Sequence, residues 1–306
     1  MQRRLIDYLI ISLKGIAMGA ADAVPGVSGG TIAFISGIYE ELINTISNVN
    51  IALVKILLSK GFMAFWKQLN GNFIVALLTG IIISFVSFMK LAKYLLENHP
   101  VLIWSFFFGL ILASIYFVAK QITKWNLATI FTLIIGTVIA FYLSKLPSLA
   151  ANDNPWFLFL AGAIAICAMI LPGISGSFIL IILGAYKTLS DAIHDFDFKK
   201  IIVFAGGALV GLLSFSHVLK WLFKNYHNAT LALLTGFIFG SLNKVWPWKK
   251  TLTWHIDSKG IKYPLLQESV SPFNFGDNNQ ILFAIFLMVF GFLTIFILEK
   301  IGSKKQ

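Results

Sequence analysis

Charged residues are scarce in this sequence, and their scarcity excludes an ordinary water-soluble fold. Asp, Glu, Lys and Arg together account for 12% of the 306 residues, which is about half the share found in typical soluble domains. Hydrophobic residues account for 58%, and a soluble fold would have to expose many of the 29 phenylalanines in large apolar patches. The composition therefore predicts an integral membrane protein that crosses the bilayer several times.

Motifs for catalysis and for metal binding are also missing. The single cysteine, Cys167, excludes an internal disulfide. The sequence has no P-loop, HExxH, CxxC or nucleophile elbow, and no dense cluster of His, Cys and Asp. We therefore expect no catalytic residue, no metal site and no cofactor, although coupling to a proton or sodium gradient stays open. The net charge of +11 comes from lysines scattered between apolar runs, which is typical of membrane interfaces and does not predict binding to nucleic acid.

Apolar segments of about 20 residues are needed to cross the hydrocarbon core as helices. Two apolar stretches are interrupted, Leu5–Ile46 at Pro25-Gly26 and Trp156–Ala192 at Pro172-Gly173. The N-terminal stretch resembles a signal peptide, but Lys14 interrupts its apolar core and we expect it to be retained. Six further segments are predicted to span: Phe73–Leu95, Val101–Val118, Leu127–Leu143, Ile201–Phe223, Thr230–Val245 and Ile281–Leu298.

Two other segments do not read as spans. The segment Ile51–Leu69 contains three lysines and is predicted to be an amphipathic helix at the membrane interface. Residues 243–280 form a polar insertion, in which Thr251–Ile256 and Ile261–Leu266 flank the turn residues Asp257-Ser258-Lys259-Gly260. This pattern predicts an extramembrane β-hairpin.

The two interruptions form an internal repeat. Pro25-Gly26-Val27-Ser28-Gly29-Gly30 followed by Gly37-Ile38-Tyr39 matches Pro172-Gly173-Ile174-Ser175-Gly176-Ser177 followed by Gly184-Ala185-Tyr186 at one constant offset. The match predicts an all-α protein of two repeats, residues 1–150 with a break at 24–31 and residues 151–306 with a break at 171–178. If each interrupted segment is a re-entrant hairpin, three spans separate the hairpins and the repeats have inverted topology. If each is a complete broken span, the repeats are parallel; we favour the inverted arrangement.

The chemistry of the breaks predicts an anion site. Pro25 and Pro172 each end a helix, the glycines permit close approach of the backbone, and Ser28 and Ser175 are expected to cap the helix that follows. Unpaired amides at the positive end of a helix dipole attract phosphate or carboxylate. A purely structural kink is the alternative. The predicted anion-binding residues at the breaks are Gly26, Ser28, Gly29, Gly30, Thr31, Gly173, Ser175, Gly176 and Ser177.

Four side chains near the breaks are predicted to assist. An ionised aspartate at the bilayer centre costs roughly 2.5–3.5 kcal/mol, so Asp22 is assigned to coupling or gating, with a plain helix cap as the alternative. The second repeat has Met169 in its place. Lys14 is expected to contact an anionic ligand or Asp22, unless it extends to the lipid headgroups. Tyr39 and Tyr186 are expected either to close the pocket or to lie in the aromatic belt of the interface.

The residues around the two breaks resemble those of a known membrane family. The run from Lys14 to Asp22, the run from Val24 to Thr31 and Gly37-Ile38-Tyr39 resemble a bacterial membrane family once known only as a domain of unknown function, as do Leu171 to Ser177 and Gly240-Ser241…Trp246-Pro247-Trp248. The resemblance implies a translocase in the cytoplasmic membrane that returns undecaprenyl phosphate, the polyprenyl phosphate carrier of cell-wall synthesis, to the cytoplasmic leaflet. Inverted hairpins that open to opposite faces would provide an alternating-access route for it. We expect membrane lipids as partners and, from the missing catalytic motifs, no enzymatic activity. The sequence leaves the oligomeric state open.

Two functions other than lipid translocation are also compatible with such a membrane protein, a polyprenyl pyrophosphate phosphatase and a carrier or channel for a small anion. Pro-Gly-x-Ser also resembles a loop of the integral-membrane undecaprenyl pyrophosphatase, in which an arginine follows the serine. Here Gly29 and Gly176 follow the serines, and the sequence has only two arginines, Arg3 and Arg4. Hydrolysis would lack the cation that stabilises phosphate charge in the transition state. A carrier or channel for a small anion is the other alternative.

Overall fold

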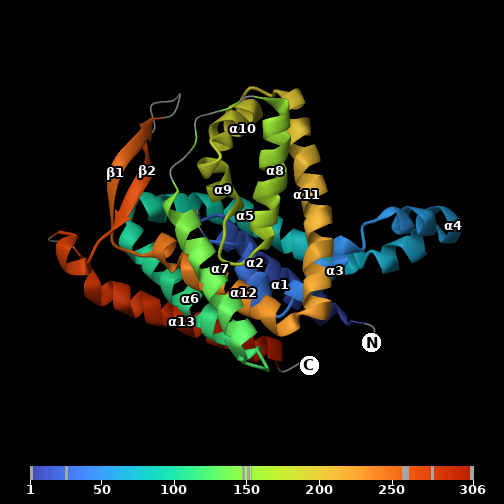
Figure 1. The fold of residues 1–306 in the computed structure, drawn as a ribbon, viewed down its shortest axis with the longest axis horizontal. Coiled ribbons are helices and arrows are strands. Elements are labelled where there is room, and N and C mark those ends of the chain that lie inside the picture. Colours follow the sequence, from blue (N-terminus) through green and yellow to red (C-terminus); the bar gives the residue numbers. More distant parts are fainter. Residues whose placement is uncertain are drawn as a thin grey trace.

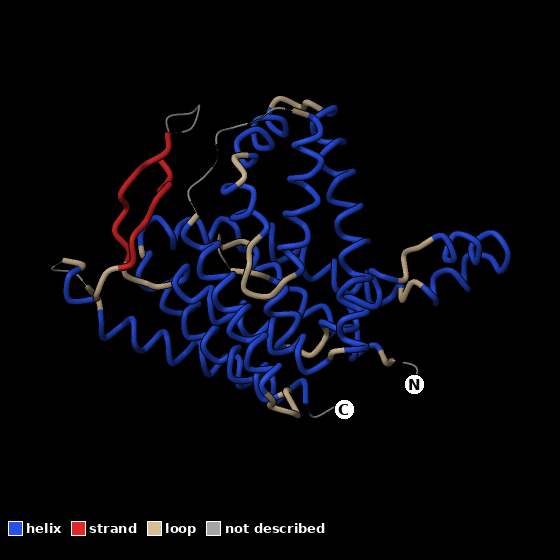
Figure 2. Tube along the Cα trace, viewed as in Figure 1, coloured by secondary structure: helices blue, strands red, loops and turns tan. Residues whose placement is uncertain are grey.

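The computed structural model describes residues 3–24, 27–146, 149, 152, 154–256, 262–276 and 279–303. These residues form an almost entirely helical protein with one two-stranded sheet (Figures 1 and 2). Four helices are long and apolar enough to cross a membrane: α5 (Gly71–Asn98), α6 (Pro100–Lys120), α7 (Leu127–Lys145) and α11 (Phe198–Asn225). They confirm the predicted all-α membrane fold.

Of the last two predicted spans, Thr230–Val245 differs from the expectation of one apolar helix and Ile281–Leu298 does not. Helix α13 (Ile281–Ser303) covers its predicted span. Helix α12 (His227–Gly240) has only 14 residues, and the chain continues as a short 3₁₀ helix, η1 (Ser241–Val245). At 1.5 Å per residue, α12 is about 21 Å long and is therefore shorter than the hydrocarbon core.

Each interrupted segment forms a hairpin of helices. The first contains α1 (Leu5–Asp22), α2 (Gly29–Ile35) and α3 (Tyr39–Ser47), and the Arg3 guanidinium contacts the Glu41 carboxylate at 2.6 Å. The second contains α8 (Pro155–Ile170), α9 (Gly176–Ile182) and α10 (Ala185–His194), and the Leu149 amide donates to the Ile182 carbonyl at 2.7 Å. In both, the chain returns towards the end at which it entered, as Figure 1 shows for α8 to α10.

Helix α4 (Ile51–Gln68) projects away from the helix bundle (Figure 1). Asn50 caps it by accepting from the Leu53 amide, and Gly61, at φ +77°, interrupts the helix. Most of its side chains are exposed, apolar and lysine alike. Its predicted location at the membrane interface stays a prediction.

The long helices pack in four pairs through small residues. The pairs are α1 with α5, α8 with α11, α6 with α13 and α7 with α12. The Ser12 hydroxyl donates to the Ala76 carbonyl across the first pair, and Gly211 of the second pair is so close to Ala163 that a methyl group would lie 2.5 Å from its carbonyl oxygen. Such contacts are typical of helices that associate within membranes, where close backbone packing replaces the hydrophobic effect.

The polar insertion contains the predicted hairpin. Strands β1 (Lys249–Ile256) and β2 (Lys262–Ser269) pair antiparallel, from Lys249 opposite Ser269 to Ile256 opposite Lys262. The predicted turn residues, Asp257-Ser258-Lys259-Gly260, lie outside the described residues. The buried Trp248 ring packs beside Val101 and Ala284 and fixes the start of the hairpin to α6 and α13.

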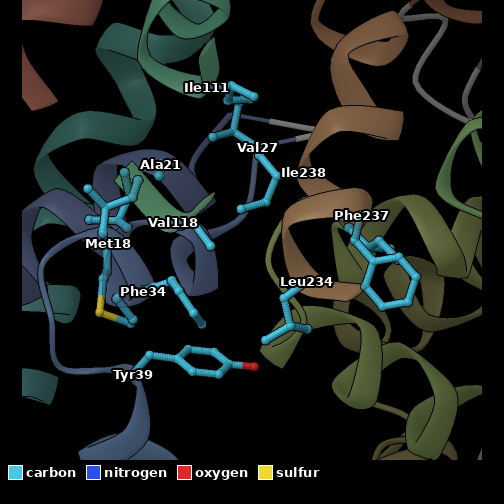
Figure 3. Close-up of a cluster of buried hydrophobic side chains, with 14 of the residues drawn as sticks. Met18, Ala21, Val27, Phe34, Tyr39, Ile111, Val118, Leu234, Phe237 and Ile238 are labelled. Carbon is cyan, nitrogen blue, oxygen red and sulfur yellow. The ribbon is translucent and has the colours of Figure 1, made fainter. Parts of the chain in front are cut away.

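The main apolar core surrounds the first hairpin. Figure 3 shows Met18, Phe34 and Tyr39 of this hairpin on one side and Leu234 and Phe237 of α12 on the other. The first hairpin therefore packs against helices of the second half of the chain, which places the two breaks near each other.

Candidate functional site

The two breaks meet in the interior of the protein. The Ser28 hydroxyl lies 3.2 Å from the Leu171 carbonyl oxygen, to which it donates. In the other direction, the Gly173 amide donates to the Thr31 hydroxyl oxygen at 2.9 Å. The residues predicted from both repeats thus form one polar contact, although more than 140 positions separate them in the chain. This contact of Ser28 and Thr31 with Leu171 and Gly173 is called the junction below.

Gly30 allows this contact to form. A Cβ atom at this position would lie 2.6 Å from the Ile170 carbonyl oxygen, closer than side chains approach backbone atoms. Helix α8 ends at Ile170, two residues before Pro172, as the position of this proline predicted. Pro25 and Gly26 lie outside the described residues.

The predicted serine caps are wrong. Ser28 and Ser175 occupy the N-cap positions of α2 and α9, but neither side chain accepts a helix amide. The Ser28 hydroxyl is directed across the junction instead, and the Ser175 hydroxyl lies 2.8 Å from that of Ser177. Both serines are buried, so each hydroxyl requires a hydrogen-bond partner, and each has one other than a helix amide.

Asp22 caps α2 in place of Ser28. Its Oδ1 atom accepts from the Gly29 amide at 2.7 Å, a length typical of a hydrogen bond to a charged group. A side chain at Gly29 would collide with the Asp22 carboxylate. In the second repeat Met169 lies in the corresponding position beside Gly176, where an added Cβ would be 3.2 Å from the Met169 Cβ. One of the amides predicted to bind an anion is therefore already paired with a carboxylate.

A small cavity of about 20 Å³ lies beside the second break. Its volume is close to that of one water probe. It brings residues of the break together with a cation that the sequence analysis missed, Lys244 of η1. The cavity is lined by Ala140, Leu143, Ser144, Gly173, Ile174, Ser175, Phe178, Ser241 and Lys244.

Lys244 lies beside an aromatic ring and a second lysine. Its ammonium is 3.9 Å from the centre of the Phe178 ring, a cation–π geometry. The Lys249 ammonium donates to the Lys244 carbonyl and lies 3.8 Å from the Trp104 ring centre. Within the described residues, neither lysine forms a salt bridge. Nothing in the spacing of the sequence links Lys244 to Ser175. Its position just after Gly240-Ser241 was the one feature that could have marked it as a residue of the site.

The other predicted residues lie apart from the junction. The Lys14 ammonium donates to the Ser36 carbonyl at 2.5 Å rather than pairing with Asp22. Tyr39 is 2% exposed, and its hydroxyl has no hydrogen-bond partner among the described residues. Tyr186 is 49% exposed. The two tyrosines therefore have different environments despite their matching positions in the repeats. No cluster of metal-binding side chains occurs in the described part of the chain.

Comparisons with known proteins agree on one family. A family model described as undecaprenyl phosphate translocase-like matches residues 18–263. A polyprenyl-phosphate transporter from Vibrio cholerae is 44% identical over 308 residues, covering 99% of this chain and 100% of the relative. One of the same name from Staphylococcus aureus is 33% identical over 253 residues, covering 77% and 85%. No solved structure matches this chain.

Proposed function

This chain belongs to the undecaprenyl phosphate translocase-like family, and we propose that it moves a polyprenyl phosphate across the bacterial cytoplasmic membrane by alternating access. The names of the relatives support the substrate. The observation that carries the mechanism is the contact between the two breaks, in which Ser28 bonds to Leu171 and Thr31 to Gly173. Recycling of undecaprenyl phosphate for cell-wall synthesis is the role that such transport would serve.

The chemistry of the substrate requires a polar passage. A phosphate group loses tens of kcal/mol of hydration, in a Born-type treatment, if it enters hydrocarbon without partners. The prenyl tail has no such cost and can stay in lipid while the headgroup crosses. The junction supplies hydroxyl groups and backbone amides within an otherwise apolar bundle.

Inverted repeats would let this junction open to either face. Helix α6 runs parallel to α13, because Phe106 contacts Phe290 and Phe117 contacts Phe296. Helix α7 runs parallel to α12 in the same way, since their glycine contacts advance together along both helices. Figure 1 shows that α6 and α7 run in opposite directions. Helices α6 and α12, which each follow a 28-residue helix, are then antiparallel, and this supports two inverted repeats that divide near residue 150.

Binding at the second break completes the proposal. The Lys244 ammonium and the Ser175 hydroxyl are suited to a phosphate oxygen, and both line the small cavity. About 20 Å³ holds one water but not a phosphate, so the substrate requires the cavity to widen. Such a movement is what alternating access provides.

Asp22 is proposed as the coupling residue. Its carboxylate accepts the hydrogen bond of the Gly29 amide and so competes with a phosphate oxygen for this donor. Protonation would remove the negative charge that repels the substrate and weaken the bond to this amide. Headgroup passage would then be linked to proton binding.

A reconstitution experiment tests the function. Liposomes with a polyprenyl phosphate in one leaflet are followed for leaflet distribution, free phosphate and conductance. We expect transfer without phosphate release, and at least about tenfold slower transfer for Ser28→Ala and Lys244→Gln. Ser214→Ala is the matched control, because Ser214 is exposed and bonds only to carbonyls of its own helix. Phosphate release from a pyrophosphate substrate would support an enzyme instead, and conductance without transfer would support an anion channel.

A further inference from the structure

A second cavity, of about 240 Å³, lies between α3 and the last turns of α11. It is much larger than the cavity at the junction and has a different lining. Its wall includes two lysines, one carboxylate and one amide: the residues are Glu40, Ile43, Asn44, Lys220, Phe223 and Lys224. The cavity is therefore polar and faces a cationic stretch of α11.

The positive charges of Lys220 and Lys224 are only partly balanced by nearby acidic groups. The two lysines lie one helical turn apart, so their side chains share one face of α11. The Lys220 ammonium contacts the Asn48 side-chain oxygen at 3.4 Å, and neither lysine forms a salt bridge within the described residues. The one carboxylate of the lining, Glu40, lies 3.8 Å from the His227 ring nitrogen. The lining therefore carries two ammonium groups against one carboxylate, and this excess of positive charge favours an anion.

The inner wall of the cavity connects it to the first hairpin. Phe223 lines the cavity and also packs against Tyr39, with ring centres 6.0 Å apart, and against Phe34 of α2 at 6.5 Å. The Tyr39 hydroxyl is buried without a partner in the described structure, which is costly for a polar group. Contacts among these three rings thus connect the cavity wall to α2, the helix that follows the first break.

We propose that this cavity is a second binding site for a phosphate monoester, the headgroup of a prenyl phosphate lipid. Its volume of about 240 Å³ is below that of pockets for drug-sized ligands and is about twelve times that of the one-water cavity at the second break, so it has room for a hydrated phosphate. Two neighbouring ammonium groups can donate charge-assisted hydrogen bonds to the oxygens of a phosphate dianion. Val218 and Trp221 on α11 are 49% and 54% exposed and offer an apolar surface for the tail. The identity of the lipid rests on the proposed function, whereas the site itself does not.

Direct binding tests the proposal on the full chain in detergent. Farnesyl phosphate is titrated by calorimetry into the wild type and into the double variant Lys220→Gln/Lys224→Gln. The Kd for farnesyl phosphate should be about tenfold higher in the double variant. Lys120→Gln/Lys124→Gln is the matched control and should leave Kd unchanged. These lysines lie at the same end of the bundle, because the intervening Thr123 amide donates to Asn228 at the start of α12.

Thiol protection locates the ligand. Cys167 is the only cysteine, so Asn44→Cys in a Cys167→Ala background places a single thiol in the cavity wall. Farnesyl phosphate should slow its alkylation at least about fivefold, whereas inorganic phosphate and phosphatidylglycerol vesicles should not. Equal protection by inorganic phosphate would overturn the lipid headgroup assignment, and equal protection by phosphatidylglycerol would overturn the monoester assignment.

The outcomes separate this site from the transport function. An unchanged Kd in the α11 double variant together with an unprotected thiol would overturn the site while leaving transport possible. Protection of the thiol in a protein that transfers no lipid between leaflets would uphold the site and overturn the proposed function. Melting temperatures of all variants, compared with that of the wild type, establish that they are folded.

Discussion

Replacing Asp22 by asparagine removes a negative charge from the junction while keeping an acceptor for the Gly29 amide. The bond that Asp22 makes to this amide is 2.7 Å long, as expected for a charged acceptor. Asparagine is about as favourable an N-cap as aspartate, so Asp22→Asn should lower stability by less than about 1 kcal/mol. Asp22→Ala leaves the amide without an acceptor and should cost about 1–2 kcal/mol.

Transport should separate the two roles of this residue. If Asp22 carries the coupling proton, Asp22→Asn should abolish the response of transport to an imposed pH gradient even though the protein is nearly as stable as the wild type. The assay is leaflet transfer in liposomes with and without the gradient, together with thermal unfolding in detergent. An unaltered pH response would reduce Asp22 to a helix cap. Equal stability of Asp22→Ala and the wild type would refute the hydrogen-bond reasoning.

Three further predictions concern packing and charge. Gly30→Ala places a methyl group 2.6 Å from the Ile170 carbonyl oxygen, so it should lower the free energy of unfolding by about 1–3 kcal/mol and stop leaflet transfer. The control is Gly206→Ala, whose added methyl group would have its nearest neighbour 3.8 Å away and should stabilise its helix by up to about 1 kcal/mol. Equal melting temperatures of the two variants would contradict this reasoning. Tyr39→Phe removes a buried hydroxyl that lacks a partner in the described structure, so the melting temperature should stay the same or rise, and a clear fall would show an unseen bond. Burial and the nearby Lys244 charge lower the pKa of Lys249 from its ordinary 10.5 to about 7. Between about pH 7 and about pH 10.5 the unfolded chain therefore binds more protons than the folded one, so the melting temperature should rise with pH over this range. Lys249→Met removes the titrating group and should flatten that rise.

Much of the architecture could be predicted because it depends on local chemistry. The low charge content and the apolar runs predicted the membrane helices, and Pro172 correctly predicted the end of α8. Two short runs that flank the turn residues Asp257-Ser258-Lys259-Gly260 predicted the β-hairpin, and its strands pair as expected. In each case a short segment determines its own conformation, so no knowledge of distant residues was needed.

The arrangement of the site depends on contacts between distant segments, and there the sequence was less informative. Ser28 was expected to cap its own helix, but the packing of the two hairpins offers its hydroxyl the Leu171 carbonyl instead. Lys244 enters the second break from η1, about 70 residues further along the chain. Neither contact leaves a periodic pattern or a motif in the sequence, because both result from tertiary packing.

The two breaks differ in charge, and this difference bears on the direction of transport. The first break carries the Asp22 carboxylate, whereas the second has Met169 in that place and the Lys244 ammonium beside its cavity. A binding site with unequal sides changes how fast each side loads, but it does not change the equilibrium distribution of the lipid between leaflets, because affinities around a closed cycle must balance. Accumulation in one leaflet therefore requires a second ligand that is bound differently in the two states. A proton on Asp22 would meet that requirement. On this argument, Asp22→Asn should still equilibrate prenyl phosphate between leaflets and should fail only to concentrate it under a pH gradient.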